Sequence, residues 1–261
     1  MTGFDWQTAT DGEVDHEYSP SRFAKRPLDE YLAEYDTLSA PHRRQVLAST
    51  GAPLLVYIHG GYWQRLSAAD SLFNAADAVR HGVSLHAVEY TLAPAATVHQ
   101  IVQECVADVR RVLGLLDPVS VVVAGCSAGA HLAAMCAREP DIAARIDGIA
   151  LLSGIYDVRP IVRTPTNDPL GLTPGSAAEV SPMLLPTTVP TKRALLAVGA
   201  HESSEFVRQN REYGERLARD GTDVQTEVVA DRDHFDLPYD LLSPGTVVGD
   251  WVLGVLKGNH S

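Results

Sequence analysis

Short apolar runs alternate with amphipathic segments along most of this chain. The apolar runs are expected to form buried strands, at 54–58, 84–90, 120–124, 146–152, 194–198 and 224–229. The segments around and between these runs have the apolar spacing of helices, at 28–47, 68–80, 101–116, 128–138, 204–219 and 247–256. This alternation predicts an α/β protein with a mostly parallel central sheet and helices on both faces.

Two segments do not follow the alternation of predicted strands and helices. Residues 1–50 form an N-terminal arm and helix, and the first 15 of them show so little apolar pattern that we expect a draped arm. Residues 158–190 contain seven prolines and room only for short helical pieces. A segment of that length without long helices or strands is usually functional, so we interpret 158–190 as a lid or pocket wall. It would be an insertion in a single domain that spans residues 1–261.

Composition and charge narrow the class of protein. The chain has 261 residues, is 45% hydrophobic and carries a net charge of 21 − 33 = −12. That charge argues against nucleic acid or an anionic membrane as a partner and fits a solvated surface. The partner that we expect is a small-molecule substrate. The acidic start has no apolar core for a signal peptide, and no apolar run approaches the ~18 residues of a membrane span. We therefore expect a cytoplasmic protein, with a homodimer as an open alternative to a monomer.

The sequence offers little support for a cofactor or metal. Cys105, Cys126 and Cys136 are odd in number and lack ligand spacing, which favours small buried residues in a reducing compartment. The Asp-Arg-Asp-His run at 231–234 has no second cluster of ligands to complete a metal site. No G-x-G-x-x-G follows a strand, so no dinucleotide site is indicated.

The clearest chemical motif lies at the end of the 120–124 strand. Gly125, Ser127 and Gly129 have G-x-S-x-G spacing across a junction of strand and helix. Such a junction places a serine hydroxyl on a sharp turn, and the glycines avoid collisions with neighbouring backbone. Ser127 is therefore a candidate nucleophile, and the Ala128 N–H is a candidate oxyanion donor.

A serine nucleophile needs a histidine base, and three histidines follow Ser127 in the chain. His234, in the turn after the last predicted strand, can reach back over the sheet and is our candidate. His201 is a weaker alternative, and His260 adjoins the terminus.

The acid of such a site should follow the penultimate strand. Glu202 stands there, and its carboxylate could accept the His234 Nδ1–H; it could also be simply a carboxylate at a helix N-terminus. Asp157 also ends a strand and is the alternative. The aspartates near His234 are less favoured because they are too close to it in sequence.

A second oxyanion donor is expected after the first predicted strand. His59-Gly60-Gly61 can present backbone N–H groups near the nucleophile, so Gly60 and Gly61 would act with Ala128. The neighbouring aromatic residues Tyr62 and Trp63, together with Tyr156, are candidates for the wall of the substrate pocket. A packing role in the core is the alternative for Tyr62 and Trp63.

Several motifs together resemble the serine-hydrolase type of kynurenine formamidase (arylformamidase), within the α/β-hydrolase superfamily. They span nearly the whole chain: Tyr-Ser-Pro-Ser-Arg at 18–22, His-Gly-Gly-Tyr-Trp-Gln at 59–64, Ser-Ala-Gly-Ala-His-Leu at 127–132, Gly-Ala-His-Glu at 199–202 and Asp-His-Phe-Asp at 233–236. The chain departs from the family pattern at Cys126, where histidine is expected, and at Glu202, where aspartate is usual.

The resemblance implies an α/β-hydrolase fold and hydrolysis of the N-formyl amide of an aryl amine, with N-formyl-L-kynurenine as the first candidate. No cofactor is implied. The alternative enzyme is a carboxylesterase for short acyl esters, whose commoner motif has a third glycine where Tyr62 stands. A third hypothesis is a non-catalytic binding protein on the same fold. Such proteins usually lose a residue of the triad, whereas this chain has a candidate for each of the three positions.

Overall fold

A six-stranded parallel sheet forms the centre of the molecule. The computed structural model describes residues 4–45, 47–188 and 190–258. The strand order is β2-β1-β3-β4-β5-β6, and every neighbouring pair is parallel. The strands are β1 (Leu54–Ile58), β2 (Ser84–Val88), β3 (Val121–Cys126), β4 (Gly148–Leu152), β5 (Arg193–His201) and β6 (Asp223–Asp233). The predicted sheet is thus confirmed, with β6 running on to the residue before His234.

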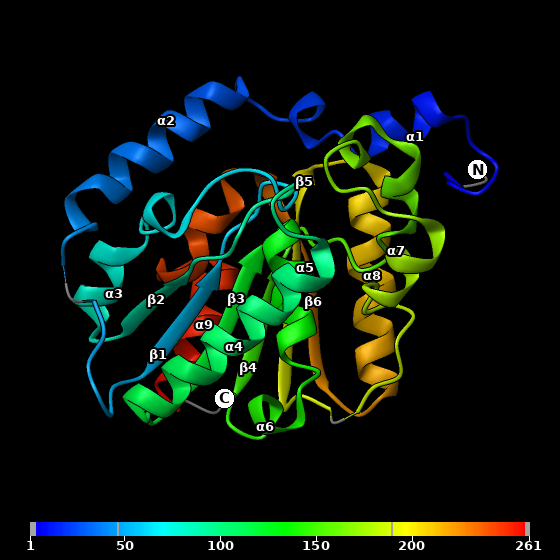
Figure 1. The fold of residues 1–261 in the computed structure, drawn as a ribbon. Helices are drawn as coiled ribbons and strands as arrows, with labels where there is room; N and C mark the ends of the chain where they lie inside the picture. The colour runs from blue at the N-terminus through cyan, green and yellow to red at the C-terminus, as the bar shows by residue number, and fades with distance from the viewer. Residues whose placement is uncertain (1–3, 46, 189, 259–261) are drawn as a thin grey trace.

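Alternate residues of the strands face two separate cores. Val56 and Val123 belong to the core beneath α4 (Val98–Leu116), α5 (Ala128–Cys136) and α8 (Ser204–Arg219). Leu55 and Val122 belong to the core beneath α3 (Ala75–His81) and α9 (Val247–Leu256). Because successive strand side chains point to opposite faces, continuous apolar runs are needed to bury both faces. Figure 1 shows α4 and α5 in front of the sheet and α9 behind it.

Most of the helices that cover the sheet match the predicted ones closely, but the helix expected over 68–80 is a 3-10 turn at Ala68–Asp70 followed by an α-helix at Ala75–His81. The α-helices are α1 (Asp11–Glu17), α2 (Leu28–Ser39), α3 (Ala75–His81), α4 (Val98–Leu116), α5 (Ala128–Cys136), α6 (Pro140–Ala143), α7 (Pro174–Glu179), α8 (Ser204–Arg219) and α9 (Val247–Leu256). Short 3-10 helices are η1 (Pro20–Arg22), η2 (Ala40–His42), η3 (Ala68–Asp70), η4 (Arg159–Arg163), η5 (Pro165–Asn167) and η6 (Leu237–Leu242). The helix predicted over 28–47 ends early, at Ser39, because Pro41 follows in the next turn.

The N-terminal segment lies across the carboxyl edge of the sheet (Figure 1). It is more ordered than the draped arm predicted for its first 15 residues. Thr10 and Glu13 form a reciprocal capping box that begins α1, and Val14 inserts fully into the core. A polar sequence with one buried valine gives little periodic signal, which is why this helix was not predicted.

The segment 158–190 folds into η4, η5 and α7, as its prolines suggested. It packs mainly against α1 and its own short helices, and Val158 and Ile161 are fully buried. It lies beside α8 and α1 in Figure 1. Most of this insertion therefore forms a wall of the domain at the end where α1 sits.

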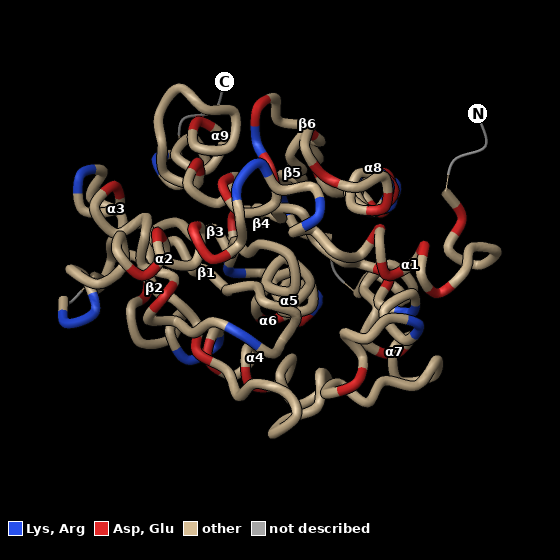
Figure 2. Tube along the Cα trace, turned by 90° about the horizontal axis from the view of Figure 1, so that it is seen from above, with Lys and Arg blue, Asp and Glu red and all other residues tan. Residues whose placement is uncertain are grey.

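Charged positions are dispersed over the molecule. Seen from above the carboxyl edge, Lys and Arg are interspersed with Asp and Glu along the chain (Figure 2). Within the described ranges, no helix is both long and apolar enough to cross a membrane.

Candidate active site

Ser127 occupies the sharp turn between β3 and α5. Its φ is 57° and its ψ is −122°, a conformation that non-glycine residues adopt rarely and that is typical of functional sites. The backbone is held there because the Ser127 N–H donates to the Leu152 carbonyl at 2.8 Å. Among the described residues, the Ser127 side chain makes no capping hydrogen bond to α5. Its hydroxyl is therefore available to a ligand.

The two glycines of the motif are required by close approach of backbone. A Cβ on Gly125 would lie 2.3 Å from the Gly129 carbonyl, and a Cβ on Gly129 would lie 2.0 Å from the Ile58 carbonyl. These distances are far inside van der Waals contact and involve backbone, which cannot move aside. The crowding that the G-x-S-x-G spacing predicts is confirmed.

His234 follows β6, and its ring is fixed by a carboxylate. The His234 Nδ1 lies 2.7 Å from the Glu202 Oε2, and the two side chains are 4% and 1% exposed. Phe206 packs against the imidazole edge to face, with ring centroids 4.8 Å apart. Because Nδ1 bonds to the carboxylate, Nε2 is the nitrogen that can exchange a proton with a ligand.

Glu202 is itself oriented by two donors. Its Oε1 accepts hydrogen bonds from the Ser153 hydroxyl at 2.6 Å and from the Gly199 N–H at 2.7 Å. Asp157, the alternative acid, pairs instead with Arg159 at 2.8 Å and is 4% exposed. The structure thus brings Glu202, and not Asp157, to His234.

Asp233 anchors the turn that carries His234. The fully buried carboxylate accepts from the Tyr31 hydroxyl at 2.5 Å and from the N–H groups of Lys25 and Phe235 at 2.8 and 2.9 Å. Burial raises the pKa of Asp233, but these hydrogen bonds outweigh it and lower the pKa overall. The N-terminal segment and α2 therefore help to fix the position of the histidine.

A cavity of about 260 Å³ opens beside these groups. Ser127 and His234 both line it, together with Gly60, Gly61 and Tyr62 from the loop after β1. Its other walls come from the N-terminal segment, α2, β1, the loop that follows β1 and the turn after β6, and include Tyr18, Ser19, Pro20, Ser21, Leu28, Leu32, Tyr35, Tyr57, Arg65, Asp70, Phe73 and Phe235. Among the described residues of the 158–190 insertion, Thr166 lines the cavity.

The glycine loop lies directly against Ser127. A Cβ on Gly60 would be 2.8 Å from the Cys126 carbonyl and 3.2 Å from the Ser127 Cβ. Only glycine permits this approach, which brings the loop to the start of α5, where Ala128 lies. Backbone N–H groups at such a place can stabilise a developing negative charge.

Two predicted wall residues lie elsewhere. Trp63 and Tyr156 are fully buried and do not line the cavity, which corrects the expectation for both. The Trp63 ring packs edge to face on His131, with centroids 5.1 Å apart. Tyr156 turns back over Gly154, where any Cβ would strike its ring, and stacks on Tyr213 at 4.3 Å. Of the three predicted aromatic residues, Tyr62 alone lines the cavity.

Cys126 borders the cavity while it packs in the core. It is 6% exposed, and its thiol lies 3.5 Å from the His234 carbonyl, at the range of a weak S–H hydrogen bond. Burial raises the pKa of the thiol well above its usual value, so the thiolate is disfavoured. Cys126 is thus a small buried residue, as expected, and it belongs both to the core and to the cavity wall.

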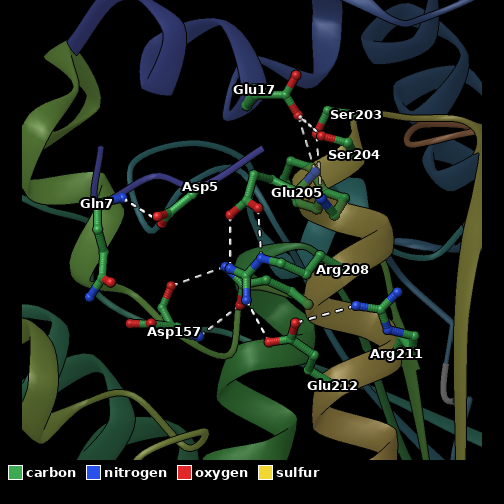
Figure 3. Close-up of polar contacts among 12 residues, drawn as sticks. Asp5, Gln7, Glu17, Asp157, Ser203, Ser204, Glu205, Arg208, Arg211 and Glu212 are labelled. Atoms are coloured by element: carbon green, nitrogen blue, oxygen red, sulfur yellow. Dashed lines mark hydrogen bonds and ion pairs between the residues drawn. The ribbon is translucent and has the colours of Figure 1, made fainter. Parts of the chain in front are cut away.

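A polar network ties the N-terminal segment to the first turns of α8, next to Glu202. The Tyr18 hydroxyl donates to the buried Glu205 at 2.8 Å, and Arg208 pairs with the same carboxylate at 2.6 Å. Glu17 accepts from the Ser204 hydroxyl at the start of α8 (Figure 3). In the sequence, Tyr18 could be recognised only as part of the Tyr-Ser-Pro-Ser-Arg motif at 18–22. A contact between residues more than 180 positions apart leaves no local signal.

Two buried histidines near the site carry no charge at neutral pH. Burial lowers the pKa of both His59 and His131 to about 4. The opposing effect of a carbonyl partner is smaller for each: Gly60 lies 3.0 Å from His59 Nδ1, and Val180 lies 2.6 Å from His131 Nε2. His59 also stacks on Tyr90, with ring centroids 4.1 Å apart.

These pKa values predict a loss of stability in acid. An unfolded histidine takes up its proton near pH 6.5, whereas the folded one resists protonation until about pH 4. Stability is therefore complete above pH 6.5 and falls between pH 6.5 and 4. We expect each histidine to lower the free energy of unfolding by about 2 kcal/mol between pH 7 and 5. Urea unfolding at both pH values measures this; His131→Gln should remove about half of it, and an unchanged pH dependence in that variant would contradict the assignment.

The fold and this strained serine turn define the chain as an α/β hydrolase. A family model described as alpha/beta hydrolase fold matches residues 55–236. A kynurenine formamidase of Danio rerio is 32% identical, covering 89% of this chain and 92% of the relative. One from Drosophila melanogaster is 30% identical, covering 71% and 67%. The chain belongs to the kynurenine formamidase family.

Solved structures show the same fold at lower sequence identity. A candidate thioesterase from Silicibacter sp. tm1040 superimposes with a TM-score of 0.80 at 22% identity, covering 94% of this chain and 99% of that chain. An esterase from the archaeon Pyrobaculum calidifontis has a TM-score of 0.72 at 14% identity, covering 95% of each chain. Relatives and family together support a hydrolase.

Proposed function

We propose that Ser127, His234 and Glu202 form a catalytic triad that hydrolyses the N-formyl amide of an aryl amine. The first candidate substrate is N-formyl-L-kynurenine, which would give L-kynurenine and formate. The observation that carries the proposal is the 2.7 Å contact between His234 and Glu202, made beside a cavity that Ser127 also lines. The named relatives supply the substrate class.

The triad would work in two steps. The Ser127 hydroxyl attacks the formyl carbon as His234 Nε2 takes its proton, and the oxyanion is held by backbone N–H groups of Gly60 or Gly61 and Ala128. His234 then gives the proton to the leaving nitrogen, which releases the aryl amine and leaves a formyl ester on Ser127. Water, deprotonated by His234, attacks that ester, and His234 returns the proton to the Ser127 oxygen as formate leaves.

The walls of the cavity suit an aromatic leaving group better than a bulky acyl group. Gly60 packs closely against Ser127, so the glycine loop closes one side of the site beside the serine. The cavity is bounded by several aromatic side chains, among them Tyr35, Tyr57 and Phe73. A formyl group is the smallest acyl group, so selectivity would rest on the aromatic part of the substrate.

A carboxylesterase is the second candidate, because esterases share this fold. Purified protein assayed on N-formyl-L-kynurenine and on p-nitrophenyl acetate separates the two. We expect a higher kcat/KM for the formamide. Turnover of the ester alone would refute the formamidase, and turnover of neither would favour a binding protein on the hydrolase fold.

A further inference from the structure

The mouth of the cavity carries an unpaired cation. Arg65 is the one lysine or arginine among the described residues that line the cavity, and its side chain is exposed. It forms no ion pair or side-chain hydrogen bond with any residue in the described ranges, unlike Arg43 and Arg159. In a chain of net charge −12, a free guanidinium beside a mainly apolar cavity calls for an explanation.

Asp70, the one carboxylate among the described residues that line the cavity, already has partners. Asp70 lies 3.2 Å from the Arg43 guanidinium and accepts a hydrogen bond from the Ser67 hydroxyl at 2.7 Å. Its negative charge is therefore partly compensated from outside the cavity. Arg65 keeps its full hydrogen-bonding capacity for a ligand, since a guanidinium offers five N–H donors.

The loop that holds the oxyanion donors also fixes Arg65. The Arg65 N–H donates to the Gly61 carbonyl at 3.1 Å, and a Cβ on Gly61 would lie 2.5 Å from the Arg65 carbonyl. Tyr62, Trp63 and Leu66 all have φ between 52° and 68°, which folds the chain tightly around this contact. The Trp63 carbonyl accepts from the Ala93 N–H at 2.8 Å, so the loop is anchored to the body of the protein. The backbone of Arg65 thus has a set position relative to the nucleophile.

We infer that Arg65 binds the carboxylate of an amino-acid side arm on the aryl amine and so determines the specificity of the site. The inference rests on the proposed function. With the formyl group at Ser127, the aromatic ring would fill the apolar part of the cavity, and a charged arm would stay at the hydrated mouth. A guanidinium matches a carboxylate through two parallel hydrogen bonds, which an ammonium cannot form.

Product binding tests this assignment independently of formamide chemistry. L-kynurenine and kynuramine share the ring, the chain and the ammonium, and differ by the carboxylate. Each is measured as a competitive inhibitor of p-nitrophenyl acetate turnover. We expect L-kynurenine to bind the wild-type protein about tenfold more tightly than kynuramine, and Arg65→Gln to abolish this preference without changing the kynuramine Ki. Arg65→Lys should keep part of the preference.

Arg44→Gln is the matched control, because Arg44 is also exposed and forms no ion pair within the described residues but lies outside the cavity. It should leave both Ki values unchanged. A wild-type protein that binds the two amines equally, or an Arg65→Gln variant that keeps the preference, overturns the inference whatever the activity on formamides. Failure to hydrolyse N-formyl-L-kynurenine, with the preference intact, overturns the proposed function alone.

Discussion

Replacing Ser127 with alanine should lower kcat by roughly four to six orders of magnitude on whichever substrate the protein hydrolyses. The hydroxyl is the group that would form the bond to the acyl carbon, and no other side chain can take its place at the turn. Alanine tolerates the Ser127 backbone about as well as serine does, so the thermal midpoint should change little. Steady-state rates on p-nitrophenyl acetate and N-formyl-L-kynurenine measure the effect.

Ser120→Ala is a suitable control, since Ser120 directly precedes β3 at the end opposite to Ser127, where it donates to the Leu256 carbonyl. Its loss should leave kcat within about threefold. If Ser127→Ala kept a tenth of the activity or more, the nucleophile would have to be another group. Cys126 would be the first to examine, although its buried thiol is poorly suited to ionise.

The order of strands and helices could be predicted because each element is marked locally. The helices at 204–219 and 247–256 begin and end where their apolar periodicity does. The glycines at 125 and 129 mark a serine turn because their role is steric and depends on neighbours in sequence. Chain order then placed Glu202 and His234, since the polar residues that follow parallel strands gather at one edge of the sheet.

The walls of the cavity could not be predicted in the same way. Burial of Trp63 depends on a left-handed backbone at that residue, and burial of Tyr156 on the missing side chain of Gly154. Neither condition is visible in periodicity. The contribution of the N-terminal segment depends on contacts between Tyr18 and α8, far apart in sequence. An exposed Arg65 likewise looks like any surface arginine until the loop around it is folded.

Replacing Glu202 with glutamine should lower kcat by about 10³- to 10⁴-fold, because it is expected to invert the histidine tautomer. The Oε1 position of Glu202 faces two donors, Ser153 and Gly199, so the amide of glutamine would place its oxygen there. Its NH₂ group would then face His234 Nδ1, which could only accept a hydrogen bond. The ring proton would move to Nε2, and that nitrogen could no longer take the proton of Ser127.

Asp157→Asn supplies the control and the discriminating comparison. Asp157 also follows a strand but pairs with Arg159, so the Asp157→Asn variant should keep kcat within about threefold of the wild-type value. Glu202→Asp should keep more activity than Glu202→Gln, since an aspartate still accepts from Nδ1 even though its shorter arm lengthens the contact. Near-normal kcat in Glu202→Gln, combined with a large loss in Asp157→Asn, would transfer the orienting role to Asp157. Equal losses in both variants with lowered thermal midpoints would instead show that each carboxylate acts through folding, because a tautomer effect leaves the midpoint nearly unchanged.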